Sequence, residues 1–233
     1  MNYDNLVLHI PHSSAEGLDD SGWPMTDAFR TIVNRWTDWA TDSLFTVSSY
    51  DSVYDRVRAV IFPISRFVVD VERLPDDPLE KKGQGIVYHQ FDEFHRAVSP
   101  EEKTRLLDIY HSHHSRVASL LTPESLLIDC HSFPSHLSDI DVCIGCNDDW
   151  SCPPPEVIDL VVGTFKQAGY KVAINIPYSN SVTPPCAFRY HSVMIELNKR
   201  TYWDETLLQT TPNAAKLHAL IIDLYKKLLH KPN

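Results

Sequence analysis

The sequence predicts an α/β protein with three layers, in which helices cover both faces of a mixed, mainly parallel sheet. Short apolar runs, many of them bounded by proline, alternate with stretches whose apolar residues recur every three or four positions. Branched apolar residues stand in a row in the central run, as they do in buried strands of parallel sheets. The 233 residues contain no repeat, low-complexity tract or linker, so we expect a single domain over 1–233.

Seven apolar runs predict the strands. Residues Asn5–Ile10 form the first, which Pro11 breaks. The central run begins with Leu126-Leu127-Ile128 and ends in a polar tip before Pro134. In chain order the runs are 5–10, 57–64, 67–75, 126–134, 140–144, 170–176 and 191–197.

Helical spacing of apolar residues predicts helices in the intervening stretches. Residues 25–50 hold one or two of them. Ser99-Pro100-Glu101-Glu102 places an N-cap, a proline and early acids in the order that a helix start requires. The remaining helices are 100–121, 155–169, which Gly169 ends, and 212–229.

Two proline-bounded segments are expected to be loops. Residues 75–85 are rich in proline, acids, lysine and glycine, which favours an exposed loop. Residues 177–185 are polar, and such loops often carry substrate contacts. His111, His113 and His114 are predicted on the solvated face of their helix, because positions i, i+2 and i+3 do not gather on one side.

Composition excludes several classes of partner. A formal net charge of -10 argues against broad electrostatic binding to nucleic acid or to an anionic membrane surface. No apolar run approaches the length of a membrane span, and the first residues lack the basic flank of a signal peptide. We therefore expect a cytoplasmic protein with a small-molecule partner; its oligomeric state does not follow from the sequence.

The cysteines allow more than one interpretation. Cys143-Ile144-Gly145-Cys146 is a CxxC pair with Cys152 nearby, but the chain has five cysteines and no second CxxC. Reduced, mostly buried thiols are therefore the favoured interpretation. A redox or metal-storage role for these three cysteines is an alternative.

The common nucleophile and nucleotide motifs GxSxG, GxGxxG and the P-loop are absent. Ser132 follows His131, but neighbouring residues in a strand face opposite sides, so this pair is poorly arranged for proton transfer.

Imidazole and carboxylate groups do recur where the predicted strands end, at the edge where ligands of α/β sheets bind. They are His12, Asp70, Arg73, Asp129, His131 and Glu196, with Asp38 or Asp42 on a nearby helix. Two imidazoles and a carboxylate can form an open zinc site, a further carboxylate can accept a proton from water, and an arginine can hold an anionic substrate.

These positions fall in six motifs: His9-Ile10-Pro11-His12-Ser13, Thr37-Asp38-Trp39, Val69-Asp70-Val71-Glu72-Arg73, Asp129-Cys130-His131-Ser132, Asn175-Ile176-Pro177-Tyr178-Ser179 and Ile195-Glu196-Leu197-Asn198. Over nearly the whole chain, this series resembles the N-formylglutamate amidohydrolase family. The resemblance implies the fold of zinc carboxypeptidases and phosphorylase/hydrolase-like proteins, and a link to histidine catabolism.

The resemblance also implies roles for individual residues. One zinc ion, or another divalent metal, would be bound by His12, Asp38 and His131. Glu196 would be the general base, and Arg73 would hold the substrate carboxylate. The amino-acid part of the substrate would contact Tyr178, Ser179, Asn180 and Ser181. Asp129 and Asp70 would lie behind the metal ligands, where a carboxylate can orient an imidazole. His9, inside its strand, is the alternative to His12.

The implied activity is zinc-dependent hydrolysis of a short, anionic N-acyl amino acid, with N-formylglutamate giving glutamate and formate as the leading case. Two departures bear on the substrate: Glu72 stands where the family usually has Asn, and Asn180 where it usually has Gly. Another zinc deacylase or carboxypeptidase-like hydrolase of acyl-amino acids or small peptides is the first alternative. A non-catalytic ligand-binding relative is the second.

Overall fold

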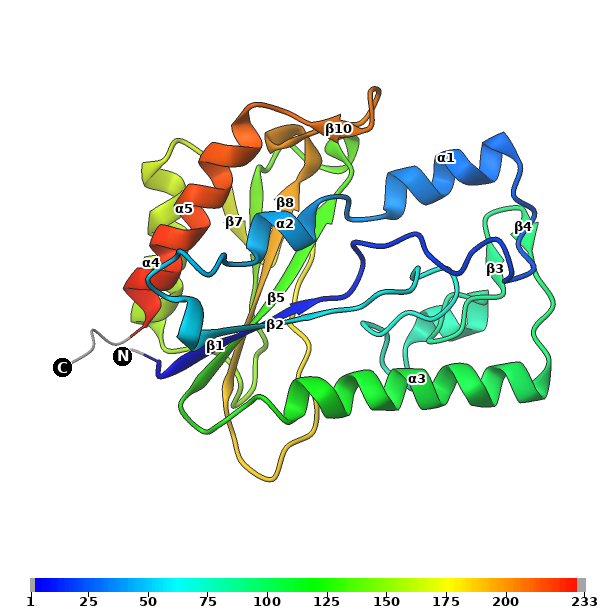
Figure 1. Ribbon diagram of the computed structural model, residues 1–233, viewed down its shortest axis with the longest axis horizontal. Helices are drawn as coiled ribbons and strands as arrows, with labels where there is room; N and C mark the ends of the chain where they lie inside the picture. Colours follow the sequence, from blue (N-terminus) through cyan, green and yellow to red (C-terminus); the bar gives the residue numbers. More distant parts are fainter. Residues whose placement is uncertain (1–2, 230–233) are drawn as a thin grey trace.

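A six-stranded sheet runs through the computed structural model, which describes residues 3–229 (Figure 1). The strand order is β2-β1-β5-β8-β6-β7. The pair β6 and β8 is antiparallel and the other pairings are parallel, which confirms the mixed, mainly parallel sheet. Its strands are β1 (Asn5–Ile10), β2 (Val57–Ile61), β5 (Ser125–Phe133), β6 (Val142–Gly145), β7 (Val172–Ile174) and β8 (His191–Asn198).

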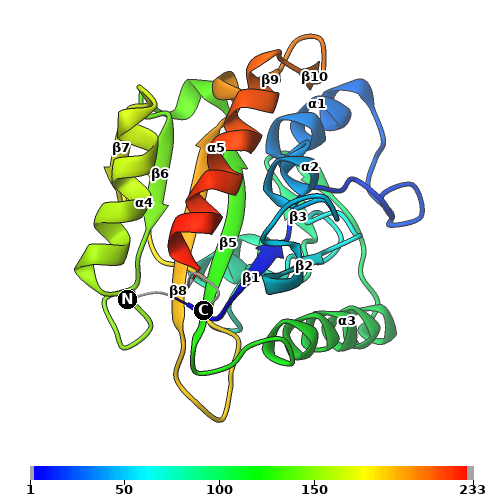
Figure 2. The ribbon, with the colours of Figure 1, turned by 60° about the vertical axis from the view of Figure 1, so that its left-hand side comes forward.

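Three helices cover one face of this sheet: α2 (Thr41–Phe45), α4 (Pro155–Gln167) and α5 (Asn213–Leu228) (Figure 2). Alternate residues of the strands, such as Leu6, Ile128 and Ile195, are fully buried against them. Burying such a side chain contributes about 1.5–3 kcal/mol. This helical layer fixes the position of the central strands.

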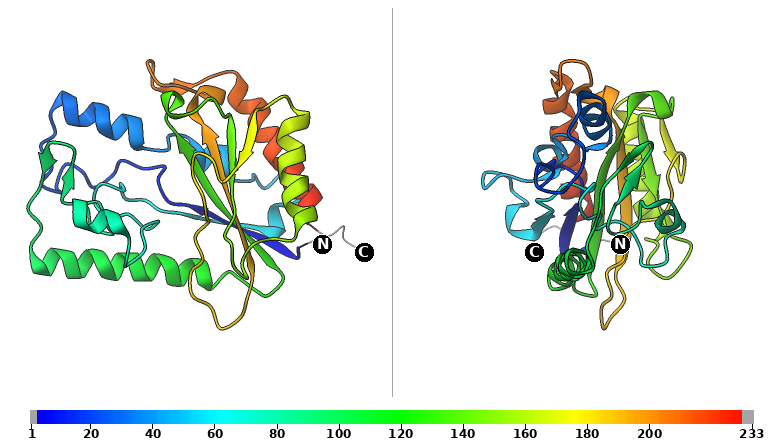
Figure 3. Two further views of the ribbon diagram at one scale, coloured as in Figure 1. Left: turned by 180° about the vertical axis from the view of Figure 1, so that it is seen from behind. Right: turned by 90° about the vertical axis from the view of Figure 1, so that its right-hand side faces the viewer.

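The opposite face is covered by the end of α3 (Pro100–Ala118) and by the loop 178–190 (Figure 3). Val7, Leu127 and Val117 pack there with Tyr190. The Ser99 hydroxyl caps α3 by accepting from the Glu102 N–H at 3.1 Å, as the sequence predicts. The second layer is therefore one helix and a loop, and the site described below opens on this side.

Beyond the carboxyl ends of β1 and β2, the chain forms a second apolar cluster (Figure 1). It is built from α1 (Asp27–Trp36), part of α3 and the segments 15–25 and 62–98. The small elements are the strand pairs β3 (Gln90–Phe91) with β4 (Phe94–His95) and β9 (Trp203–Asp204) with β10 (Gln209–Thr210), and the 3-10 helices Tyr54–Arg56, Pro78–Lys82, Ser135–Leu137 and Lys199–Thr201. No helix among residues 3–229 is both long and apolar enough to cross a bilayer.

The strand predicted at 67–75 is wrong, because this segment forms consecutive turns. The Val68 and Val69 N–H groups both donate to the Ser65 carbonyl, at 2.9 and 3.3 Å. Phe67, Val68, Val69 and Val71 are buried in the second cluster instead of in a sheet, and Leu74 is exposed. A short apolar run reports burial, and burial alone does not distinguish a strand from turns packed against a core.

Other predicted boundaries also change. The stretch 25–50 divides into α1 and α2, with a break at 37–40. The loop 75–85 contains the 3-10 helix Pro78–Lys82. The prediction for the three histidines of α3 is wrong for His113, which is 7% exposed, because it continues the buried face of Leu106, Tyr110 and Val117. Spacing of 3.6 residues per turn was the signal for that position.

Candidate active site

Strand register brings four of the polar side chains onto one face of the sheet. His131 on β5 lies opposite Glu196 on β8, and Asp129 on β5 lies opposite His9 on β1. Because side chains alternate along a strand, all four project toward the α3 side. Asp129 and His131 lie inside β5, in the polar part of the strand that the sequence predicts before Pro134.

Two further side chains reach the same place from loops. His12 follows Pro11 just beyond β1. The break between α1 and α2 places Asp38 beside it, because the Asp38 N–H donates to the His12 carbonyl at 2.9 Å. Ala40 adopts φ 63° where this break ends. Asp42, the other acid that the sequence allowed, is four residues farther on in α2 and bonds the Ser43 N–H instead.

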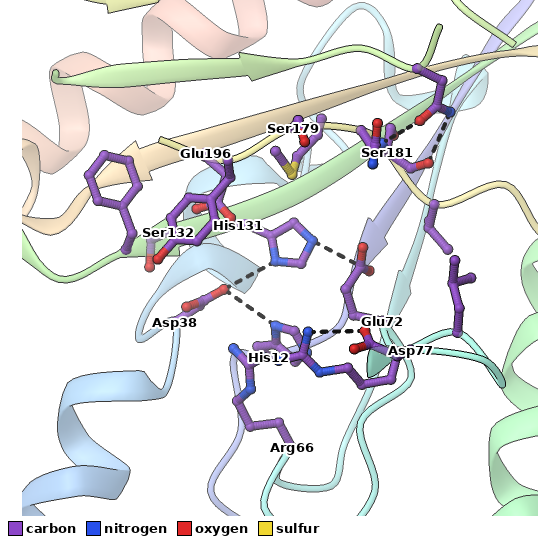
Figure 4. A pocket seen from close by; sticks show the side chains of 18 of the residues that line it. His12, Asp38, Arg66, Glu72, Asp77, His131, Ser132, Ser179, Ser181 and Glu196 are labelled. Atoms are coloured by element: carbon purple, nitrogen blue, oxygen red, sulfur yellow. Dashed lines mark hydrogen bonds and ion pairs between the residues drawn. The ribbon is translucent and has the colours of Figure 1, made fainter. Parts of the chain in front are cut away.

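His12, Asp38 and His131 point toward one another (Figure 4) and form a group that could hold a metal ion. Asp38 Oδ2 lies 3.8 Å from His12 Nδ1 and 3.4 Å from His131 Nδ1. Ligand atoms of a tetrahedral zinc site, with bonds of about 2.0–2.1 Å, are about 3.3 Å apart. His12 Nδ1 and Asp38 Oδ2 are buried and have no hydrogen-bond partner. The donor set and its spacing therefore fit a divalent metal.

Buried carboxylates hold both imidazoles by the opposite nitrogen. His12 Nε2 lies 2.7 Å from Asp70 Oδ1, and His131 Nε2 lies 2.9 Å from Asp129 Oδ1. Each carboxylate accepts the Nε2–H and leaves Nδ1 facing Asp38, which is how outer carboxylates orient metal-binding histidines. Burial lowers the pKa of His12 to about 4, so its Nδ1 carries a lone pair at neutral pH.

His131 is in a different charge state. Burial opposes its protonation, but the charges and hydrogen bonds of Asp129, Asp38 and Glu72 raise its pKa well above the ordinary value. Burial likewise opposes ionisation of Asp129, yet the charge and hydrogen bonds of His131 and His9 lower the pKa of its carboxyl well below the usual range. In the metal-free protein this pair is ionic.

Glu196 lies beside the group, with its Oε2 atom buried and without a hydrogen-bond partner. Burial, reinforced by the charges of Asp38 and Asp129, raises its pKa to about 8. Such a carboxyl is well suited to exchange a proton near neutral pH. A cation held by the three facing ligands would favour its ionised form.

A cavity of about 590 Å³ opens in front of these residues. This volume falls in the range of small-molecule sites. The loop residues predicted to contact substrate all line it: Tyr178, Ser179, Asn180 and Ser181. The loop is fixed by the Ser181 N–H, which donates to Asn147 Oδ1 at 3.0 Å. Asn180 has φ 70°, a left-handed conformation that glycine and asparagine tolerate, which accounts for Asn at this position.

Arg73 lines the same cavity, with its side chain 21% exposed. Its guanidinium donates to the Tyr88 hydroxyl at 3.0 Å and lies 3.4 Å from Asp77 Oδ2. Asp70 lies within 3.6 Å of it and also bonds Arg66 and Tyr88. These contacts hold the guanidinium at the wall of the cavity.

A sequence model of the N-formylglutamate amidohydrolase family matches residues 4–203 of this chain. The chain belongs to the N-formylglutamate amidohydrolase family. A crystal structure of N-formylglutamate amidohydrolase from Ralstonia eutropha JMP134 is similar in fold, with a TM-score of 0.80 and 20% sequence identity. The alignment covers 98% of this chain and 93% of that one.

A second solved structure, the gene product Atu2144 from Agrobacterium tumefaciens, has a TM-score of 0.66 and 16% identity. The alignment covers 97% of this chain and 91% of that one. A comparison with curated protein sequences finds no match. Membership of the N-formylglutamate amidohydrolase family identifies this chain as a hydrolase of the amidohydrolase type.

In this member of the N-formylglutamate amidohydrolase family, sequence reasoning overlooked Arg66 and Tyr88. Arg66 lines the cavity and donates to Asp70 Oδ2 at 2.9 Å. The four-residue spacing of Arg66 and Asp70 is the available signal, but the apolar run between them predicts a strand, in which residues four apart are not neighbours. Tyr88, far along the chain, gave no local signal.

Glu72 also lines the cavity, with its side chain 23% exposed. Its Oε2 lies 3.6 Å from His131 Nε2, and burial raises its pKa to about 7. Together with His9 and Asp129 it forms a second group of possible metal ligands. His9 Nδ1 and Asp129 Oδ1 are only 2.8 Å apart, a hydrogen-bond distance, so direct bonding explains that contact without an ion.

Proposed function

We propose that this chain is a metal-dependent hydrolase of short N-acyl amino acids, with zinc as the leading metal and N-formylglutamate as the leading substrate. One observation carries the proposal. Buried His12 Nδ1 and Asp38 Oδ2 have no hydrogen-bond partner and face His131 Nδ1 beside the cavity that Glu196 lines. Burying such polar atoms without a partner is costly, and a bound ion would remove that cost.

A divalent ion bound by His12, Asp38 and His131 would supply Lewis-acid polarisation of the acyl carbonyl and of a water molecule. Glu196 takes the proton from the attacking water and returns it to the departing amine. Water oxygen adds to the acyl carbon, and the C–N bond breaks. The products are the free amino acid and the acyl acid, which is formate for a formyl substrate.

Two arginines are assigned to the negative charges of the substrate. Arg66 donates a hydrogen bond to Asp70, which in turn bonds His12, whereas Arg73 lies 3.6 Å from Asp70, so Arg66 has the shorter link to a metal ligand. We assign to it the charge that develops on the acyl oxygen. Arg73 lies farther along the wall with Tyr88 and Asp77, and we assign to it a substrate carboxylate.

Replacing Arg73 with Lys tests the substrate assignment. Losing a two-point contact to a carboxylate is expected to raise KM for N-formylglutamate roughly 10–100-fold, with a smaller effect on kcat. KM and kcat are measured by formate release for N-formylglutamate, its α-amide and N-formylglutamine. If Arg73 binds one of the two carboxylates, Arg73→Lys should change KM little for the substrate in which that carboxylate is replaced by an amide.

Arg58→Lys, on an exposed position of β2, is the matched control. Equal losses for all three substrates would contradict the assignment of Arg73. If the metal-loaded protein hydrolyses none of the three compounds, N-formylglutamate and its amides are not its substrates. N-acetyl and aspartyl compounds would then be the next to test.

Metal affinity is expected to rise with pH. The raised pKa of His131 means that its ring is protonated in the metal-free protein near neutral pH, and Nδ1 must lose that proton to bind a metal. Metal binding displaces one proton from His131, so below this pKa the metal affinity should increase about tenfold for each pH unit. Chelator competition between about pH 6 and pH 8 measures it.

Asp129→Asn provides the control for that pH dependence. The substitution removes the anion that most strongly raises the pKa of His131. With a lower pKa, His131 loses its proton at a lower pH, so metal affinity should stop rising at a lower pH than in the unaltered protein. An affinity for metal that does not change with pH in the unaltered protein would contradict His131 as a ligand through Nδ1.

A further inference from the structure

A chain of hydrogen bonds leads from α3 to the ring of His131. His113 Nε2 lies 2.8 Å from His9 Nε2, and His9 Nδ1 lies 2.8 Å from Asp129 Oδ1. The same carboxylate oxygen lies 2.9 Å from His131 Nε2. His9 and Asp129 are fully buried, and His113 is 7% exposed. Three imidazoles and one carboxylate thus form a continuous network behind the cavity.

The directions of these hydrogen bonds follow from the acceptor. Asp129 Oδ1 accepts from both His9 Nδ1–H and His131 Nε2–H, because an ionised carboxylate has no proton to donate. Its other oxygen accepts from the Val182 N–H at 3.0 Å. Three donors from β1, β5 and the loop 178–190 therefore fix both the position and the rotation of this carboxylate.

His9 is held in turn by His113. One hydrogen lies between the two Nε2 atoms, because two would clash and none would leave two lone pairs facing each other. Phe62 packs edge-on against the His113 ring, with 4.9 Å between ring centroids. Both ring nitrogens of His9 are engaged, so it has no lone pair left for a metal. This geometry also favours His12 over His9 as the ligand.

We propose that His9 is a positioning residue for the metal site, which His113 supports. It holds Asp129 in the orientation that fixes the ring of His131, with Nδ1 facing Asp38 and His12. The inference rests on the proposed metal site. Outer partners of metal ligands typically contribute 10–100-fold to metal affinity, so this role has a measurable size.

A matched pair of variants separates positioning from packing. Asn and Leu are close in shape, and the Asn amide can place its N–H where His9 Nδ1–H lies. His9→Asn therefore keeps the donor to Asp129, and His9→Leu removes it. Both lose the contact to His113. A difference in zinc affinity between His9→Asn and His9→Leu therefore measures the contribution of the hydrogen bond to Asp129.

The readout is zinc affinity, measured by chelator competition, which does not depend on turnover. His9→Leu is expected to bind zinc roughly 10–100-fold more weakly than the unaltered protein, and His9→Asn within about threefold of it. Cobalt loading adds a spectroscopic check, since the visible bands of the cobalt protein should shift in His9→Leu only. Equal affinities for both variants, whether normal or weakened, would overturn the proposal.

His113 supplies a second pair in case His9→Leu does not fold. The Gln amide can donate where His113 Nε2–H lies, so His113→Gln is expected to retain zinc better than His113→Leu by several-fold. Equal retention would again count against the inference. An unaltered protein that binds no zinc would instead refute the proposed metal site, so the two failures are distinguishable.

Discussion

Replacing Glu196 with Gln is expected to lower kcat for the proposed substrate by about 10²–10⁴-fold, the usual contribution of a general acid–base group. Gln keeps the size of the side chain but cannot accept the proton of water. Because Glu196 lies outside the His12, Asp38 and His131 group, bound metal should remain near one per chain. Formate release and metal analysis of the same preparation measure both quantities.

Asp149→Asn is the matched control for Glu196, since Asp149 is another carboxylate of the cavity wall but is exposed and bonded to Ser151. It should retain most of the activity. If Glu196→Gln kept more than about a tenth of kcat, the assignment of Glu196 as the base would be wrong. Loss of metal together with activity would assign it to the metal site instead.

Replacing Asp38 with Asn is expected to weaken metal binding by at least about 100-fold, more than the loss of an outer partner. Asp38 supplies the only carboxylate of the three-residue group, and its Oδ2 has no hydrogen-bond partner. The negative charge of Asp38 also stabilises protonated His131, and the neutral Asn side chain would not provide that charge. Activity should fall in parallel, and added zinc should restore part of it.

Asp42→Asn controls for the loss of one acid in the same region. Asp42 bonds the Ser43 N–H and takes no part in the group, so its replacement should leave metal affinity within about threefold. Circular dichroism of both variants checks that they fold. Similar metal affinities for Asp38→Asn and Asp42→Asn would contradict the ligand assignment.

The sheet could be predicted because its central strands carry strong local signals. The runs in β1, β5 and β8 are apolar, short and bounded by proline or polar residues, and their predicted positions are confirmed. The alternation of side chains then places Asp129 and His131 on one face. The run at 67–75 carries the same signal but owes its burial to a second apolar cluster, so its structure depends on distant residues.

The site was partly accessible from the sequence. Motifs pointed to His12, Asp38, His131 and Glu196, and the structure brings these residues to one cavity, although their roles stay proposals. The sequence also indicated Asp70 and Asp129 behind the two histidines, but not the residues that hold these carboxylates in turn. Tyr88 meets Asp70, and His113 meets His9, only through tertiary packing. Such contacts join residues far apart in the chain, so no local sequence pattern identifies the two partners.

The most direct test of metal-dependent hydrolysis is formate release from N-formylglutamate by one protein preparation as purified, after chelation and after addition of zinc. We expect activity to disappear on chelation and to return with about one zinc per chain, since a single group of three facing ligands is proposed. Formate release that persists at full rate in the fully chelated protein would contradict the account.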